Sequence, residues 1–402
     1  MARVQALVTP SVMRWAREQA RLSLDEASSK IKRSPEEIAA WEEGTLRPSI
    51  AQARKASEVY RRPLAVFYLP DPPKDFETLR DYRSLADTEV REFSPELAFL
   101  IRIAHHRQDW MRDYLLSEGF EPLTFVGAAS TEDIPQDIPQ DIRKVIQVSP
   151  KEQRECETRY EALRLWIERS EAAGVFIFRQ RQISLIEARG FLISDDIAPF
   201  IFINSEDSKS AQLFTLAHEL AHLWLNLSGI SNLETRGRAI DQETRRIEVF
   251  CNKVAAYTVL DDQVFNDEWE GLSPTIPLEE RIHHVSGALK VSEEVVARRL
   301  LEKNEISQET YRNLRHFYQD RWEEVKARER YRMKSSKGGP SYYVTTAAKV
   351  GYAFTQTVVS AFMSGAISGR DASSLLNVKV NNLRRLGKVA GIPSVNREGY
   401  RG

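Results

Sequence analysis

The residues with the clearest chemical meaning lie in segment 212–225, which reads QLFTLAHELAHLWL. His218 and His222 are four residues apart, so a helix would place both imidazoles on one face. Neutral imidazole is a common zinc ligand, and H-E-x-x-H is the spacing of two metal ligands with a glutamate beside them. Glu219 then lies where a general base could take a proton from water. The segment predicts a zinc-dependent metalloprotease site.

The competing interpretation is a pair of ordinary helical histidines, because a bare H-E-x-x-H also occurs by chance. The residues around the motif weigh against it, since apolar side chains surround the predicted helix on nearly all sides. Such a helix is expected to be buried. Burying two histidines and a glutamate without a partner would be costly, and a bound metal ion removes that cost.

A second predicted helix, residues 246–257, offers a third ligand. Glu248 and Asn252 are four residues apart and share a face. Glu248 could complete a His2Glu site with one open position, and Asn252 could hold a ligand by a hydrogen bond. Tyr257 is a candidate for stabilising an oxyanion, with a packed core tyrosine as the alternative. Spacing alone also leaves open a solvated Glu248, or another acid as the ligand: Glu234, Asp241 or Glu243.

The run FTLAHELAHLWL followed by E-x-x-x-N-x-x-A-A resembles the ImmA/IrrE family of metallopeptidases. The preceding apolar strand 198–204 and a short polar turn fit the same pattern. Ala221 stands where glycine is common in that family, and Cys251 where alanine is common, but neither change removes a ligand. The resemblance implies a zincin-like fold, with zinc bound by three residues and Glu219 as the base: His218, His222 and Glu248.

The first 70 residues predict several short helices with clear start signals. Ser23 with Glu26 forms a capping box, and Ser34-Pro35 opens the next helix in a similar way. The pattern L-S-L-D-E-A, then S-P-E-E-I-A-A-W-E-E-G, then R-P resembles an XRE-type helix-turn-helix domain. The resemblance implies a five-helix domain whose third helix enters the major groove of DNA.

That third helix is acidic, which leaves the role of the domain open. It contains no Arg, Lys, Gln or Asn, and carboxylates facing phosphates would repel them. Direct DNA recognition and a dimerisation or partner-docking role both fit. The acidic residues of this helix are Glu36, Glu37, Glu42 and Glu43.

The composition indicates a soluble protein of two or three domains. The chain has 402 residues, of which 42% are hydrophobic and 29% charged. No stretch approaches the roughly 20 consecutive apolar residues of a membrane span. The N-terminus lacks the apolar core of a signal peptide, and two cysteines are too few for a disulfide framework. We therefore expect a cytoplasmic protein with no membrane partner.

The net charge of −1 conceals a basic C-terminus. From Arg315 to the end there are 16 Lys and Arg against 6 Asp and Glu. Within this region, residues 372–386 predict helix, turn and helix. The second of these helices carries residue types that contact phosphates and base edges, although a basic cap on the peptidase is an equal alternative. The candidate DNA-binding residues are Lys379, Asn381, Asn382, Arg384 and Arg385.

The expected fold is mainly α with a small β-sheet, in the α+β class. Expected strands are 174–178, 183–187, 190–194 and 200–204, the last of these or a neighbour being a candidate edge for pairing with an extended substrate. The repeat DIPQDIPQDI at 133–142 predicts a loop, because repeated proline opposes a helix. The expected parts are an XRE-like domain (1–70), a helical linker region (71–150), the peptidase domain (151–270), a helical extension (271–335) and a basic helical HTH-like domain (336–402).

The family resemblance also implies a substrate class. Family members act on repressors, often of the XRE type, and so switch on stress or mobile-element genes. The expected function is therefore a zinc endopeptidase and transcriptional regulator that cleaves such a repressor. The rival hypothesis is a DNA-binding antitoxin whose peptidase domain binds a cognate toxin. DNA and a second copy of the chain, as a homodimer, are further candidate partners.

Overall fold

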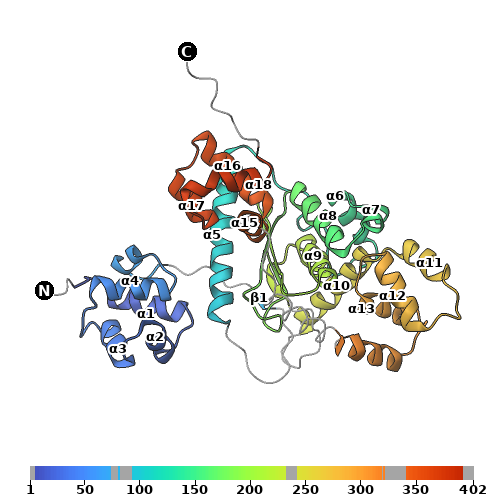
Figure 1. Cartoon of the computed structure of the whole chain (residues 1–402), viewed down its shortest axis with the longest axis horizontal. Helices are drawn as coiled ribbons and strands as arrows, with labels where there is room; N and C mark the ends of the chain where they lie inside the picture. Colours follow the sequence, from blue (N-terminus) through green and yellow to red (C-terminus); the bar gives the residue numbers. More distant parts are fainter. Residues whose placement is uncertain are drawn as a thin grey trace, which may run out of the picture. The chain divides into compact units, whose positions relative to one another are not determined.

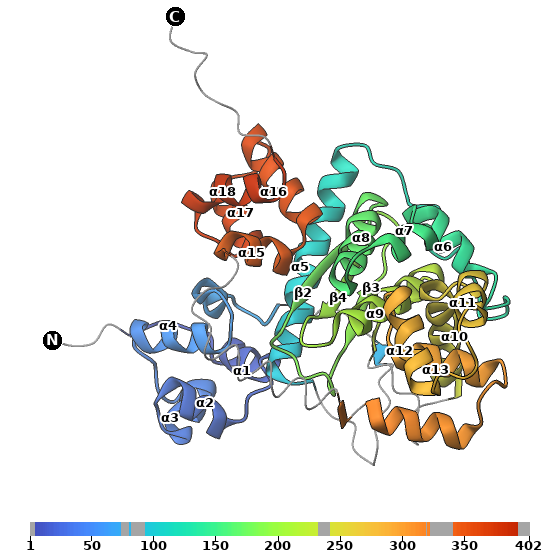
Figure 2. The same ribbon diagram turned by 45° about the vertical axis from the view of Figure 1, so that its right-hand side comes forward.

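The computed structural model describes residues 5–73, 80–81, 93–231, 242–318, 320–321 and 341–392. The chain divides into two compact units, 1–78 with 89–107, and 79–88 with 108–402. Figures 1 and 2 show the elements of each unit. Much of the first part of the expected linker region, residues 74–79 and 82–92, lies outside the described residues. Helices dominate and one small sheet is present, as the sequence predicted.

The first unit begins with the predicted helix-turn-helix domain. Ser23 and Glu26 form the predicted capping box, and Ser34 caps the third helix with Pro35 in its first turn. Trp41 and Tyr60 are fully buried in the small core of this domain. Its elements are α1 (Pro10–Gln19), α2 (Leu24–Ile31), α3 (Pro35–Glu43), α4 (Ile50–Val59) and the 3-10 helix η1 (Leu64–Tyr68). The expected five-helix arrangement is confirmed.

The second unit contains a mixed sheet with strand order β1-β5-β3-β4-β2. Strand β3 is antiparallel to both of its neighbours, whereas β2 pairs parallel with β4 and β1 pairs parallel with β5. The strands are β1 (Arg80–Asp81), β2 (Phe176–Gln180), β3 (Gly190–Ile193), β4 (Phe200–Asn204) and β5 (Gly229–Ser231).

Two expectations about these strands need correction. Strand β4 lies between β3 and β2, so its own backbone is paired on both sides and cannot accept a substrate strand. The other alternative, a neighbouring strand, is left to β2, which stands at the end of the strand order among the described residues. Residues 183–187 form turns rather than a strand. The side chain of Asn204 explains this, because its amide donates to the carbonyls of Ile183 (2.7 Å) and Ala188 (2.9 Å) and so holds the loop before β3.

Helices surround the sheet and share one large apolar core with it. Helices α8 (Arg159–Ala172) and α9 (Lys209–Trp224) contact each other, and α9 also contacts β3 and β4. Helix α10 (Gln242–Val259) packs along α9, as Figure 2 shows. The remaining helices of this part are α6 (Ile138–Ile146), α7 (Pro150–Glu155), α11 (Asp262–Glu270), α12 (Leu278–Ala288) and α13 (Glu293–Glu302). Helix α5 (Pro95–Ser117) belongs to both units, with the division after residue 107.

Only the first copy of the tandem repeat stays outside a helix, as expected. The second copy instead opens α6, where Ile138 and Pro139 occupy the first turn. Proline is tolerated there because the first N–H groups of a helix have no partner within the helix. Ile138, Ile142 and Ile146 are buried at helical spacing, which fixes the helix onto the core.

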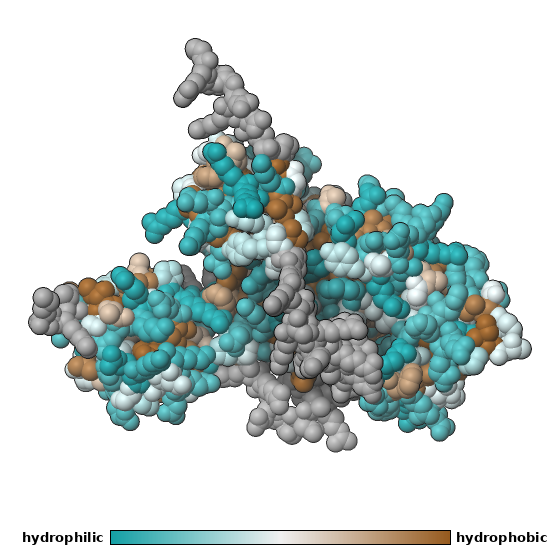
Figure 3. Space-filling view, in the orientation of Figure 1, coloured by the Kyte–Doolittle hydropathy of each residue, from teal (hydrophilic) through white to brown (hydrophobic). Residues whose placement is uncertain are grey.

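The C-terminal helical unit packs on the β2 side of the sheet, where α15 (Tyr342–Val350) and α16 (Tyr352–Ser364) both contact β2. It continues with α17 (Gly369–Leu376), the 3-10 turn η2 (Val380–Asn382) and α18 (Leu383–Val389). Among the described residues, no helix is long and apolar enough to cross a membrane. The surface in Figure 3 is mostly hydrophilic, with hydrophobic residues scattered over it.

Candidate metal centre

Helix α9 carries the H-E-x-x-H residues into the interior of the second unit. Ser208 caps its first turn by accepting from the Ala211 N–H, and all residues from Thr215 to Trp224 are buried. At its far end, Trp224 donates from Nε1 to the Asp141 carboxylate at 2.8 Å. The helix is therefore anchored at both ends, and His218, Glu219 and His222 have almost no exposed surface.

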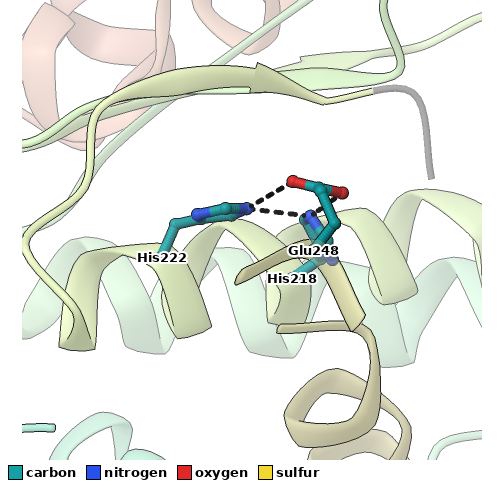
Figure 4. A group of neighbouring side chains, drawn as sticks. All are labelled: His218, His222 and Glu248. Atoms are coloured by element: carbon teal, nitrogen blue, oxygen red, sulfur yellow. Dashed lines mark hydrogen bonds and ion pairs between the residues drawn. The ribbon is translucent and has the colours of Figure 1, made fainter. Parts of the chain in front are cut away.

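Helix α10 brings Glu248 to the two histidines. One Glu248 oxygen lies 3.1 Å from His222 Nε2, and the other lies 3.5 Å from His218 Nε2. The two imidazole Nε2 atoms are themselves 3.1 Å apart. Figure 4 shows all three side chains converging on one point, and their ligand atoms all lie within 4.8 Å of one another. Each of the three residues is buried.

The donor set of this group fits zinc. Two imidazole nitrogens and one carboxylate oxygen are the ligands of a His2Glu zinc site. Burial lowers the pKa of His222 despite the nearby Glu248, which favours the neutral imidazole that binds metals. Burial alone would raise the pKa of Glu248, but His218 and His222 outweigh it and hold that pKa at about 2. His222 and Glu248 are therefore both in the protonation state of a metal ligand at neutral pH.

The structure allows one of the competing acids to be compared with Glu248. Glu243 is exposed in the first turn of α10, so it does not reach the buried histidines. Glu234 and Asp241 lie outside the described residues. Among the residues that the structure describes, the group of His218, His222 and Glu248 is the one with metal-ligand geometry.

Glu219 lies against strand β3, at a contact that sequence reasoning missed. A Cβ atom added to Gly190 would lie 2.6 Å from Glu219 Oε1 and 2.6 Å from Thr215 Cγ2. Glycine at position 190 therefore leaves the room that the Glu219 carboxylate occupies. A glycine inside a predicted strand often marks such a close approach, so the signal was present in the sequence.

The other candidates from α10 have different surroundings. Asn252 is buried one turn after Glu248. Cys251 is buried, and burial with the nearby Glu248 and Glu219 carboxylates raises its pKa well above the usual value, so it stays a neutral thiol. Tyr257 lies nine residues after Glu248, roughly 13 Å along the helix axis. Its hydroxyl accepts a hydrogen bond from Gln136 at 3.1 Å, and its ring packs against Arg299. These contacts give no support to an oxyanion role.

The acidic helix α3 of the N-terminal domain differs from the expectation in one respect. Glu42 does not face outward, because its carboxylate is buried and accepts from Arg17 Nε and Nη2, both at 2.8 Å. Glu37 accepts from the side chain of Gln52 in α4 at 2.9 Å. Glu36 and Glu43 remain exposed, so the outer face of α3 is less acidic than its sequence suggested but still carries no cation.

The C-terminal candidates lie on η2 and α18, except Lys379, which directly precedes η2. Lys379, Asn381, Arg384 and Arg385 are exposed, whereas Asn382 is partly buried. The Tyr343 hydroxyl donates to Asn382 Oδ1 at 3.1 Å, and the guanidinium of Arg385 lies over the Tyr343 ring.

Comparison with known protein families identifies two parts of the chain. Residues 171–301 match a peptidase family model described as an IrrE N-terminal-like domain. Residues 13–67 match a helix-turn-helix family model. A comparison with curated proteins found no match. The chain thus joins an N-terminal helix-turn-helix domain of the XRE type to an IrrE-like peptidase domain, and the metal-ligand group lies within the matched peptidase region.

Proposed function

We propose that this protein is a zinc-dependent endopeptidase that cleaves a repressor-type protein. The observation that carries the proposal is the buried convergence of His218, His222 and Glu248, with Glu219 on the same helix. A structural role alone would not require two imidazole nitrogens to face each other and a carboxylate in an apolar core. The family match of the surrounding residues supports the same chemistry.

His218, His222 and Glu248 would hold the metal, and Glu219 would move the proton. Bound zinc supplies a Lewis acid, which polarises a carbonyl and lowers the pKa of water. The Glu219 carboxylate takes the proton from the attacking water and returns it to the nitrogen of the leaving amine. Its contact with β3 at Gly190 fixes the carboxylate beside the sheet. Asn252, buried one turn farther along α10, would orient one of the ligands.

The presence of a helix-turn-helix domain and a peptidase domain in one chain supports a role in the regulation of gene expression. A helix-turn-helix domain in the same chain suggests DNA binding, and it also offers a surface for docking on an XRE-type repressor. Cleavage of that repressor would release stress or mobile-element genes. This role places the protein in the cytoplasm, where repressor and DNA are found.

Metal content tests the site directly. We expect about one zinc per chain by elemental analysis of the purified protein, and the same amount in Glu219→Gln, because Glu219 is not a ligand. His222→Ala should lose the metal. A wild-type protein that holds no metal and takes up none from added zinc would contradict the proposal. The rival role, an antitoxin that binds a cognate toxin through this domain, would then be preferred.

The substrate class needs a separate experiment. New protein N-termini should be mapped in cells that express the wild type and in cells that express Glu219→Gln. We expect one or a few cleavages that depend on Glu219, within a DNA-binding repressor. Cleavages confined to proteins of another kind would retain the peptidase and reject the repressor as its substrate.

A further inference from the structure

The C-terminal unit repeats the helix-turn-helix of the N-terminal domain. Segment 23–34 reads SLDEASSKIKRS, and segment 368–379 reads SGRDASSLLNVK. Both begin with a serine that caps the first helix, followed three residues later by an acid, and both contain Ala-Ser-Ser at the same place. The equivalent helices are α2 with α17 and α3 with η2 and α18.

The turn between the two helices is built in the same way in both copies. Ser28 Oγ donates to the carbonyl of Arg33 at 2.6 Å, and Ser373 Oγ donates to the carbonyl of Val378 at 2.5 Å. The residue before each acceptor has the left-handed conformation, with φ of 62° at Lys32 and 53° at Asn377. Matched capping and a matched turn indicate the same supersecondary motif, which sequence periodicity alone could not establish.

The inner faces of the second helices also correspond. Ile38 and Trp41 are buried in α3, and Leu383 and Leu386 are buried at the same positions of α18. Each helix packs on a helix outside the motif, α3 on α1 and α18 on α16. At the position of Glu42, α18 has Gly387, where an added Cβ would lie 2.7 Å from Val359 Cγ1. The close approach of α18 to α16 replaces the ion pair found in the N-terminal copy.

The outer faces have opposite charge character. Three positions that are glutamate in α3 are Asn381, Asn382 and Lys388 in the C-terminal copy. Two alanines of α3 are replaced by Arg384 and Arg385. Residues 341–392 together contain six Lys and Arg and one Asp. The helix that would enter a major groove is therefore acidic in the N-terminal copy and basic in the C-terminal copy.

Three cations on α18 and just before η2 are available to a ligand. Within the described part of the chain, Lys379, Arg384 and Lys388 are exposed and make no ion pair. Tyr343 holds Asn382 and Arg385 through its hydroxyl and its ring, so part of the surface is ordered from α15. Amide and guanidinium groups on one exposed helix face are the donors that contact phosphates and read base edges.

We propose that α17, η2 and α18 form a second helix-turn-helix that binds double-stranded DNA, with the basic face of α18 in the major groove. Arg384, Arg385 and Lys388 supply most of the attraction to phosphates, and Asn381 faces the bases. The N-terminal copy, with its acidic α3, then serves contacts with protein. This assignment does not rest on the metal centre or on peptidase activity.

The test is binding of the full-length protein to a fluorescently labelled duplex of mixed sequence, followed by anisotropy as the salt concentration rises. We expect the variant Arg384→Ala/Arg385→Ala/Lys388→Ala to lose affinity by at least tenfold at low salt. The slope of log affinity against log salt should fall by about 2.7, because each phosphate contact contributes about 0.9. Zinc content and thermal unfolding should match the wild type.

Two control variants make the result specific. Lys151→Ala/Arg164→Ala/Arg298→Ala removes three helix cations elsewhere in the second unit, two exposed and one partly buried, and should change neither affinity nor slope. Arg33→Ala/Arg47→Ala/Lys55→Ala removes cations of the N-terminal domain and should have the smaller effect. If the triple variant of α18 perturbs folding, Arg384→Gln/Lys388→Gln replaces it, since neither residue has a protein partner within the described chain. An α18 variant that binds no more weakly than the control variants would overturn the proposal.

Discussion

Two glutamates in different parts of the chain are equally buried but are stabilised in different ways. The side chains of Glu42 in the N-terminal domain and Glu248 in the peptidase domain are each 3% exposed. Glu42 meets the guanidinium of Arg17 through two parallel hydrogen bonds of 2.8 Å, so charge and geometry are balanced within the protein. Glu248 meets two imidazoles, and burial favours the neutral form of His222.

The different partners of these two glutamates distinguish a structural ion pair from a group of metal ligands. A buried carboxylate needs a compensating positive charge, because an unpaired buried charge is very costly. Arg17 supplies that charge to Glu42 permanently. The histidines supply it to Glu248 only if one of them holds a proton, and a divalent cation at the same point would satisfy all three groups. Burial of a carboxylate alone therefore does not indicate a metal site. A metal site is indicated where a buried carboxylate converges with other possible ligands and no permanent positive charge balances it.

Metal removal should produce the largest contrast between the two glutamates. With zinc at about 1,000 times its dissociation constant, we expect the free energy of unfolding to be higher by about 4 kcal/mol than after chelation. Glu248→Gln should abolish most of this difference, since it removes a ligand. Thermal or denaturant unfolding with and without a chelator measures it. Equal chelator effects in Glu248→Gln and in the wild type would contradict the ligand assignment.

Glu42→Gln should be destabilising without any dependence on metal. Removing one partner of a buried ion pair leaves the other charge uncompensated, which costs about 3 kcal/mol. Denaturant unfolding, followed by fluorescence from the buried Trp41 region, checks the expected loss. The chelator effect should be the same as in the wild type. If Glu42→Gln also loses its response to the chelator, the two glutamates are coupled and Glu42 is not an independent structural ion pair.

Gly190→Ala tests Glu219, a third buried glutamate, without touching a metal ligand. The added methyl would lie 2.6 Å from Glu219 Oε1, so the carboxylate must shift. A displacement of about 1 Å at a catalytic group can cost about 100-fold in rate, and we expect a loss of that order in Glu219-dependent cleavage. Zinc content should be unchanged. The matched control is Gly287→Ala in α12, where an added Cβ meets nothing within 4 Å and cleavage should stay at the wild-type rate.

The parts of this site that sequence predicted are those that depend on local periodicity. His218, Glu219 and His222 lie on one helix, so their relative positions follow from spacing alone. Glu248 lies 26 residues away from His222, and spacing could not choose it over the neighbouring acids without the family resemblance. The fold class and the N-terminal helix-turn-helix were predicted for the same reason as the motif helix, because caps and apolar spacing are local signals.

What the sequence could not predict depends on contacts between distant segments. The inward turn of Glu42 requires Arg17 from another helix, and the approach of Gly190 to Glu219 requires the sheet to pack on α9. The residue pattern at 183–187 predicts a strand, but the segment forms a loop because the Asn204 amide donates hydrogen bonds to the carbonyls of Ile183 and Ala188. From the sequence alone Pro139 predicts a break in a helix, because its place in the first turn of α6 depends on the packing of Ile138 and Ile142 into the core.

A fourth glutamate, Glu171, shows a third solution to burial, and its effect should be the smallest. It lies at the end of α8 beside the start of α16, and burial raises its pKa to about 8. Hydrogen bonds from the backbone amides of Ala353, Ile177 and Tyr352 act in the opposite direction, because they favour the ionised carboxylate. The folded pKa is above the unfolded value, so the folded state binds the proton more tightly and stability should fall as the pH rises from about 4.5 to about 8. We expect a loss of about 1 to 2 kcal/mol over this range, because the residue is only partly buried by surface area.

Glu171→Gln, which mimics the protonated form, should flatten this part of the curve of unfolding free energy against pH. An unchanged curve would mean that the ionised carboxylate is satisfied by the amides of α16, as Glu42 is satisfied by Arg17.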